Sequence, residues 1–140
     1  MSDSENSKEE TCKKIYILMI DDDPVMRRLF GGKLVKIGYE VIYACDGDEG
    51  RETARRLHPD VILMDERMPV MDGLEASERI REEEQTKDIP IILFTNEDMS
   101  IEAEKMAEET SIDAYVHKSS DFNVLEEAIT NVLKKRKASN

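Results

Sequence analysis

The chain has 140 residues, a length that supports one hydrophobic core and is short for two. Charged residues make up 37% of it and the formal net charge is −12, a field that repels phosphate backbones and anionic lipids. We therefore expect no nucleic-acid partner and no membrane partner. The two cysteines form no disulfide framework or zinc spacing, and no apolar run reaches the roughly 20 residues that span a bilayer. These features favour a cytoplasmic protein.

Composition also divides the chain into a central domain and two short tails. Residues 1–13 are polar and acidic and have no hydrophobic periodicity, so we expect a flexible acidic tail. Residues 14–135 carry the periodic segments and form the predicted domain. Residues 136–140 form the predicted basic C-terminal tail, and the basic run from Lys134 to Lys137 is more typical of a helix end than of a nucleic-acid site.

Five short apolar runs alternate with segments of helical periodicity. The runs are Ile15–Ile20, Val41–Cys45, Val61–Met64, Ile91–Phe94 and Ala114–His117. Several are almost continuously apolar, as in strands that are covered on both faces, and the helical segments between them favour parallel pairing through right-handed crossovers. The sequence predicts an α/β fold, a doubly wound five-stranded parallel sheet with flanking helices.

Capping residues indicate where the helices between these strands begin. We expect the helix starts at Asp23 before Pro24, at Asp48, at Asp72, at Ser100, and at Ser120 or Asp121. Gly50 weakens the second of these helices as an isolated segment.

Polar side chains follow four of the five predicted strands. They are Asp21, Asp22 and Asp23 after the first, Asp65 after the third, Thr95 after the fourth and Lys118 after the fifth. Because the carboxyl ends of parallel strands share one edge, we expect these side chains to converge. Clustered carboxylates repel one another unless a hard cation neutralises them, and an oxygen-only donor set favours Mg²⁺. A lysine and a threonine beside that cation suit phosphoryl transfer to a carboxylate.

Four stretches, taken in order, resemble the receiver domain of two-component response regulators, especially the stand-alone chemotaxis type related to CheY. They are ILMIDDDPVMRRLF, DVILMDERMPVMDG, PIILFT and DAYVHK, and the similarity spans about Lys14 to Lys135. The resemblance implies a flavodoxin-like strand order of 2-1-3-4-5. It also implies a signalling domain that promotes only its own phosphorylation and dephosphorylation and is not an enzyme in the usual sense.

The resemblance assigns the acidic residues to phosphorylation and metal binding. Asp65 would be the residue phosphorylated by a histidine kinase, a phosphotransfer protein or a small phosphodonor. Asp22 and Asp65 would bind Mg²⁺ directly, and Asp21 would bind it through a water molecule. Arg67 would contribute its backbone carbonyl to the same ion, whereas Asp23 is interpreted as a helix cap.

The resemblance also implies how a signal leaves the domain. Thr95 would hydrogen-bond the phosphoryl group and Lys118 would pair with it, while Tyr115 turns inward as Thr95 moves. A downstream protein would bind the face made by the fourth helix, the fifth strand and the fifth helix. No recognisable DNA-binding or enzymatic segment follows Lys137, so we expect a single-domain messenger, either monomeric or dimeric on phosphorylation.

The sequence departs from the receiver pattern around the predicted site. Ser119 follows Lys118 where receivers usually have a proline with a cis bond, and a cis bond to a non-proline costs about 2.5 to 4 kcal/mol, so we predict a trans bond. Asn96 stands where a small residue is usual, and it either crowds the phosphoryl group or offers it an amide donor. Arg67 and Glu97 either pair across the pocket mouth and lengthen the phosphorylated lifetime or stay as solvated surface charges.

Three other interpretations of the sequence compete with the receiver domain. Asp21, Asp23 and Val25 fit the opening motif of haloacid-dehalogenase-type phosphotransferases, with Asp21 as nucleophile, although only Asp121 is available for their later acidic motif. A receiver-like scaffold that binds partners without phosphorylation is a second alternative, and the intact acidic pair argues against it. A flavodoxin-type cofactor binder is the third, but the phosphate-binding loop that such proteins have after the first strand is absent from this sequence. We expect structural roles for both histidines, with a partner contact as the alternative for His117.

Overall fold

The computed structural model describes residues 14–68, 71–98, 100–110 and 112–139. The expected tail of residues 1–13 lies outside these ranges. The strands are β1 (Tyr16–Ile20), β2 (Glu40–Ala44), β3 (Val61–Met64), β4 (Ile91–Thr95) and β5 (Ala114–His117). The helices are α2 (Pro24–Lys36), α3 (Gly47–Leu57), α4 (Gly73–Glu82), α5 (Ile101–Glu109) and α6 (Phe122–Ser139).

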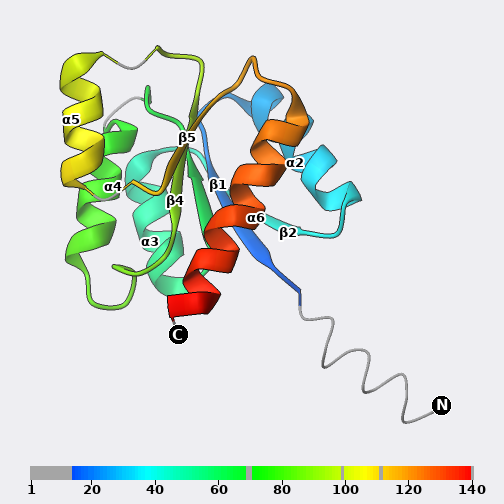
Figure 1. The fold of residues 1–140 in the computed structure, drawn as a ribbon, viewed down its shortest axis with the longest axis horizontal. Helices are drawn as coiled ribbons and strands as arrows, with labels where there is room; N and C mark the ends of the chain where they lie inside the picture. Colours follow the sequence, from blue (N-terminus) through cyan, green and yellow to red (C-terminus); the bar gives the residue numbers. More distant parts are fainter. Residues whose placement is uncertain (1–13, 69–70, 99, 111, 140) are drawn as a thin grey trace, which may run out of the picture.

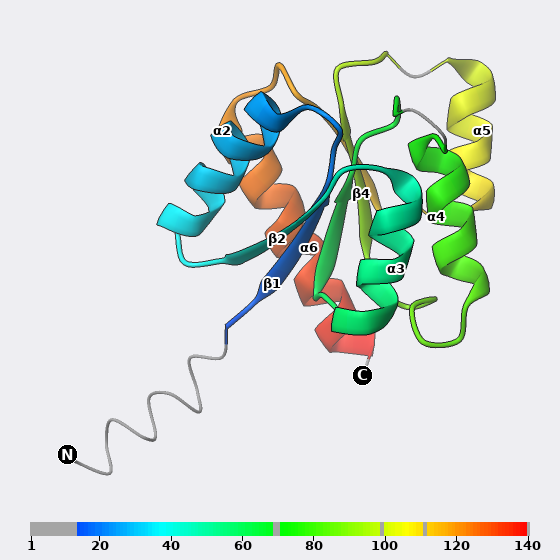
Figure 2. The ribbon, with the colours of Figure 1, turned by 180° about the vertical axis from the view of Figure 1, so that it is seen from behind.

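All strand pairs are parallel, and the sheet has the order β2-β1-β3-β4-β5. Helices α2 and α6 cover one face of the sheet, and α3, α4 and α5 cover the other, which gives three layers (Figures 1 and 2). The predicted fold class and strand order are therefore confirmed, and each strand lies within one residue of its predicted bounds.

Alternation of side chains along the strands builds two apolar cores, one on each face of the sheet. Ile17 and Met19 of β1 pack toward α2 and α6, whereas Leu18 and Ile20 pack toward α3 and α4. Both sets are almost fully buried, which is why β1 reads as a continuous apolar run instead of an alternating one. This double coverage fixes the register of the central strands, and with it the position of the residues that follow them.

The observed caps of α2 and α4 are the expected ones, whereas that of α3 is not, and α5 and α6 begin directly after Ser100 and Asp121. The Asp23 carboxylate accepts a hydrogen bond from the Val25 backbone amide at 2.9 Å, as expected for a cap before Pro24. The predicted cap at Asp48 is wrong, because Asp46 caps α3 by accepting from the Glu49 backbone amide at 2.8 Å. Asp46 has the extended backbone that a cap requires, so the helix begins at Gly47 and Asp48 falls inside its first turn.

Close packing of α3 on the sheet explains the glycine in that helix. A Cβ atom added at Gly50 would lie 2.3 Å from Cδ1 of Ile20, so the bare glycine lets α3 pack directly on β1. At the other end of the chain, α6 continues to Ser139, and residues 136–139 of the expected basic tail are helical. The domain boundaries at residues 13 and 135 stay predictions. Among the described residues, no helix is long and apolar enough to cross a bilayer.

Candidate functional site

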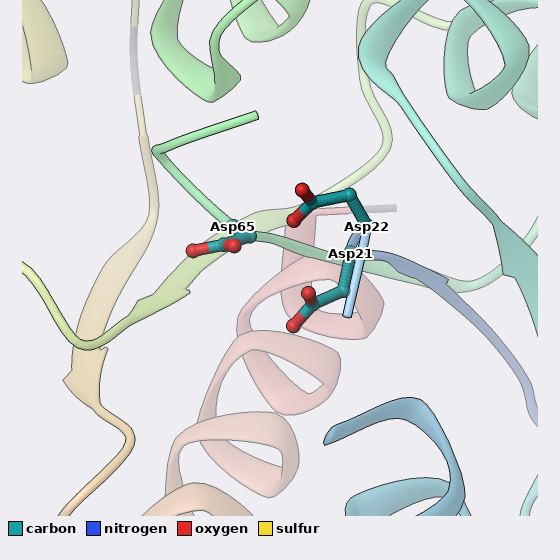
Figure 3. Close-up of side chains that lie close together, drawn as sticks. All are labelled: Asp21, Asp22 and Asp65. Carbon is teal, nitrogen blue, oxygen red and sulfur yellow. The ribbon is translucent and has the colours of Figure 1, made fainter. Parts of the chain in front are cut away.

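Three carboxylates gather where β1 and β3 end. Asp21 and Asp22 follow β1, Asp65 follows β3, and carboxylate oxygens from all three lie within 4.8 Å of one another (Figure 3). Asp21 and Asp65 are buried, at 1% and 7% exposure, whereas Asp22 is exposed to solvent. The cluster that the sequence predicted therefore forms, with one of its carboxylates open to the outside.

Backbone hydrogen bonds that continue the strand ladders hold these residues at one edge of the sheet. The Asp21 amide donates to the Ala44 carbonyl at 3.1 Å, and the Asp65 amide donates to the Ile20 carbonyl at 3.0 Å. On the other side of the site, the Lys118 amide donates to the Thr95 carbonyl at 2.8 Å. The sheet itself thus brings together residues that are far apart in the sequence.

Lys118 is the cation of this cluster and is itself buried, at 8% exposure. Its Nζ lies 2.5 Å from Oδ2 of Asp21 and 3.6 Å from Oδ2 of Asp65. Within the described ranges it is the one basic side chain that forms salt bridges with this cluster, to Asp21 and to Asp65. The cluster consequently keeps an excess of negative charge, which a bound cation would neutralise.

The environment of Asp65 favours its protonated form. Burial raises the pKa of Asp65, and the charges of Asp21 and Asp22 raise it further. The Lys118 ammonium and the Thr95 hydroxyl act in the opposite direction without cancelling the rise. An added cation beside these carboxylates would stabilise the ionised form of Asp65, which is the nucleophilic form.

The donor set fits a hard divalent cation. All three side chains offer carboxylate oxygens, and neither His nor Cys is part of the group. Asp21 is held in place by the Asp23 amide, which donates to its Oδ1 at 2.9 Å, and by Arg27, which donates to its carbonyl at 2.6 Å. Oxygen ligands that are held rigidly next to an exposed carboxylate suit Mg²⁺, which keeps several of its own water molecules.

The loop after Asp65 requires a glycine at its end. The Gly73 amide donates to the Glu66 carbonyl at 2.7 Å, and a Cβ at Gly73 would lie 2.1 Å from the Asp65 carbonyl oxygen. Asp72 caps α4 by accepting from the Glu75 amide at 2.8 Å, which confirms its expected role. The close approach of Gly73 to the Asp65 carbonyl places the N-terminus of α4 beside the site. Pro69, which the resemblance also places in this loop, lies outside the described residues.

The residues expected to act as a switch are connected through the loop after β4. The Thr95 hydroxyl is buried and accepts from the Glu97 amide at 3.2 Å. Tyr115 is 39% exposed, and its hydroxyl donates to the Glu97 carbonyl at 2.6 Å. Tyr115 and Thr95 therefore contact the same residue, although the expected inward movement of Tyr115 stays a prediction.

The residues that depart from the receiver pattern lie around the mouth of the site. Arg67 and Glu97 pair at 3.1 Å, with side chains that are 79% and 39% exposed, so the predicted pairing is formed. Asn96 is exposed at the same loop. No cis peptide bond occurs among the described residues, and the bond between Lys118 and Ser119 is trans as predicted. The effect of these residues on lifetime and the metal contact of the Arg67 carbonyl stay predictions.

The sequence did not indicate the role of two side chains near the site. Glu66 has a buried Oε1 without a hydrogen-bond partner in the described structure, and burial followed by the charges of Glu97 and Asp72 raises its pKa. His117 accepts hydrogen bonds from Ser119. Glu66 follows a strand end, which was the available signal, but its burial depends on packing that a sequence does not reveal.

Comparison with known proteins identifies the family. The sequence model of the response regulator receiver domain matches residues 17–130, which is most of the chain. The chain belongs to the receiver domain family. Receiver domains of this family are signalling phosphoacceptor domains, and the match extends to solved structures. The Vibrio cholerae chemotaxis protein CheY4 is 30% identical, with a TM-score of 0.80 over 86% of this chain and 99% of that one.

Other relatives of this receiver domain belong to larger proteins. A probable transcriptional regulator, ycf27 of Porphyridium aerugineum, is 36% identical over 88% of this chain and 50% of its own length. The receiver domain of a sensor histidine kinase from Pseudomonas aeruginosa, solved with a magnesium ion in its active site cleft, is 28% identical, with a TM-score of 0.79 over 87% of this chain and 99% of that one. The chain spans about half or less of the curated relatives it matches. Because some of these are transcriptional regulators, the expectation of no nucleic-acid partner has no support here.

Proposed function

We propose that this receiver domain accepts a phosphoryl group on Asp65 in a Mg²⁺-dependent reaction and signals through phosphorylation-dependent protein binding. The observation that carries the proposal is the convergence of the Asp21, Asp22 and Asp65 carboxylates, with the Lys118 ammonium 3.6 Å from Asp65. A histidine kinase or phosphotransfer protein would supply the phosphoryl group, as in the two-component systems to which the family belongs. The relatives include a hybrid histidine kinase from Dictyostelium discoideum, which supports this class of partner.

The proposed reaction divides its tasks among the residues of the site. Asp22 and Asp65 would hold Mg²⁺ directly, with Asp21 acting through water and Arg67 through its carbonyl. When bound, Mg²⁺ supplies positive charge to the phosphoryl oxygens and keeps Asp65 ionised. A carboxylate oxygen of Asp65 attacks phosphorus, and the bond from phosphorus to the donor nitrogen or oxygen breaks with its electron pair leaving on the donor.

The polar residues on the β4 and β5 side would stabilise the charge that is transferred. Lys118 would pair with a phosphoryl oxygen, exchanging part of its present contact with Asp21 for the new anion. The Thr95 hydroxyl would donate to another oxygen of the same group. Both residues already sit beside Asp65, so the geometry requires small movements instead of a rearrangement of the sheet.

The output surface proposed for this domain is formed by α5, β5 and α6. A hollow between α5 and β5 is lined by acidic and apolar side chains, among them Glu104, Glu108 and Tyr115. The Tyr115 hydroxyl is bonded to the loop after Thr95, so a movement of Thr95 toward a phosphoryl group would alter this surface. A downstream protein that binds one arrangement better than the other would then respond to phosphorylation.

The lifetime of the phosphorylated form is proposed to depend on the Arg67 and Glu97 pair. The pair bridges the loops after β3 and β4 at 3.1 Å, where it would hinder a water molecule that approaches phosphorus. Asn96 on the same loop would either crowd the phosphoryl group or donate to it. We expect Arg67→Ala and Glu97→Ala to speed the decay of the phosphorylated protein, and an unchanged decay rate in both would contradict this role.

The experiment that tests the proposal uses acetyl phosphate with Mg²⁺, read by intact mass, with Asp65→Asn and an EDTA sample as controls. One acid-stable, base-labile phosphoryl adduct that requires both Asp65 and Mg²⁺ is the expected result. An adduct that persists in Asp65→Asn but is lost in Asp21→Asn would support the phosphotransferase alternative. If no adduct forms, binding of Mg²⁺ and beryllofluoride separates a rapidly hydrolysing site from a scaffold that binds neither.

A further inference from the structure

The loop that carries Lys118 is shaped by a histidine that the proposed reaction does not use. Side chains alternate along β5, so Lys118 shares a face with buried Val116, whereas His117 shares the other face with Tyr115. His117 therefore cannot act beside the Lys118 ammonium. Its position allows it to act on the backbone of Ser119, the residue after Lys118.

The contacts of His117 define the state of its ring. The Ser119 backbone amide donates to Nδ1 of His117 at 3.1 Å, and the Ser119 hydroxyl oxygen lies 2.8 Å from the same atom. A backbone N–H can only donate, so Nδ1 is an unprotonated acceptor and the neutral ring carries its hydrogen on Nε2. The Ser119 hydroxyl then donates to Nδ1 as well. The neutral imidazole thus closes a short loop around Lys118.

This loop has few other restraints. The Lys118 amide is fixed by the Thr95 carbonyl at 2.8 Å, and the Ser120 amide donates to the His117 carbonyl at 3.0 Å. Between these two bonds lies Ser119, whose φ angle no proline ring fixes. The bonds to Nδ1 restrain Ser119 in addition to this turn, and the direction of a long lysine side chain depends on a backbone that stays in place.

We propose that His117 is a positioning residue for phosphoryl transfer, whose Nδ1 holds Ser119 and thereby keeps the Lys118 ammonium between the Asp21 and Asp65 carboxylates. This inference rests on the proposed function of the site. The other ring nitrogen, Nε2, lies 3.6 Å from Oδ1 of the fully exposed Asp98, a distance too long for a hydrogen bond. The effect therefore belongs to Nδ1 and not to an ion pair with Asp98.

The test uses two amides of different length in place of the imidazole. In His117→Asn the side-chain oxygen reaches the place of Nδ1 and can still accept from Ser119, whereas in His117→Gln the amide lies farther out, near the place of Nε2. We expect His117→Gln to lower the rate constant of phosphorylation by acetyl phosphate at saturating Mg²⁺ about tenfold. We expect His117→Asn to remain within about threefold of the wild type. Asp98→Asn is the matched control and should leave the rate unchanged.

The outcomes separate this inference from the proposed function. A wild-type protein that takes up no phosphoryl group and binds neither Mg²⁺ nor beryllofluoride refutes the proposed function and, with it, the role of His117. A wild-type protein that is phosphorylated while His117→Gln matches its rate overturns the inference alone. An equally large loss in Asp98→Asn would move the effect to Nε2 and also overturn it.

A measurement on the unaltered protein keeps the proposal falsifiable if His117→Gln does not fold. The ¹⁵N chemical shifts of the imidazole, recorded at pH 8 and assigned by their absence from His117→Asn, report which nitrogen carries the hydrogen. We expect the hydrogen on Nε2 and slow exchange of the Ser119 amide with solvent. A hydrogen on Nδ1 or an unprotected Ser119 amide would show that the restraint does not exist.

Discussion

The two ends of the sheet both carry charged side chains, but they satisfy them differently. At the amino end, Arg81 pairs with Asp113 at 2.9 Å and also donates to the Lys87 and Ile89 carbonyls. The Asp113 carboxylate in turn accepts from the amide that opens β4. At this end each charged group has a partner of opposite charge or a backbone partner, so these residues stabilise the fold.

The carboxyl end of the same sheet has like charges in contact. Three carboxylates converge there, and the salt bridges to them in the described structure come from Lys118. Asp65 has a raised pKa because it is buried and repelled by its neighbours. The carboxyl end, with its unbalanced like charges, is therefore the end suited to bind a ligand, since a cation supplies the positive charge that the folded chain lacks there.

The largest expected effect on stability comes from removing Arg81 at the amino end of the sheet. In Arg81→Met, Asp113 would keep its backbone donor but lose its cation, and the Lys87 and Ile89 carbonyls would lose a donor. We expect the free energy of unfolding to fall by about 2 to 3 kcal/mol, because the removed partner leaves half-buried groups unsatisfied. Urea denaturation followed by circular dichroism measures this loss, and Mg²⁺ binding should not change.

Arg79→Met is the matched control for that change. Arg79 lies on the same helix, and its pair with Glu75 at 3.4 Å is on the surface, with both side chains about half exposed. Its removal should change the free energy of unfolding by about 0.5 kcal/mol or less. Equal losses in the two variants would show that the amino end is not specially stabilised.

The next largest expected effect is the gain in stability when Mg²⁺ binds the carboxylate cluster at the carboxyl end of the sheet. A site that binds Mg²⁺ only when folded gains about 1.4 kcal/mol of stability at an ion concentration ten times its Kd. We expect thermal unfolding to shift upward with Mg²⁺ in the wild type and to respond far less in Asp22→Asn. Glu78→Gln removes an exposed carboxylate outside the cluster and should respond like the wild type. A uniform response of all three proteins would indicate nonspecific screening of charge.

Removing a carboxylate from the carboxyl end of the sheet should stabilise the ligand-free protein. Because the pKa of Asp65 is raised, the folded state binds a proton at this group more readily than the unfolded state does, and stability from this group declines as pH rises through the raised pKa. Asp65→Asn resembles the protonated form, so in EDTA at pH 7.5 we expect it to be more stable than the wild type. The gain should shrink as the pH falls through the raised pKa of Asp65, where the wild type itself takes up the proton. A destabilised Asp65→Asn at pH 7.5 would contradict the picture of unbalanced like charges at this end.

The sequence was sufficient for the sheet and for the members of the cluster. Strands buried on both faces leave an unbroken apolar run, and the polar residue at or just after the end of such a strand has a fixed place in a parallel sheet. Asp21, Asp65 and Thr95 could be placed for this reason. The same reasoning missed the bonds from Ser119 to His117 and placed the cap of α3 at Asp48 instead of Asp46, because loop conformations depend on side-chain to backbone bonds that no periodicity records.

The smallest expected effect concerns the pair at the edge between the site and solvent. Arg67 and Glu97 are exposed enough that their pair should contribute at most about 0.5 kcal/mol to the free energy of unfolding. A double-mutant cycle of Arg67→Ala and Glu97→Ala, measured by urea denaturation in low salt and again in 0.5 M NaCl, tests this value. Coupling should be weak in low salt and absent in high salt. Strong coupling that survives salt would mean that the pair contributes to the stability of the fold. The carboxyl end of the sheet would then also be stabilised by paired charges, as the amino end is.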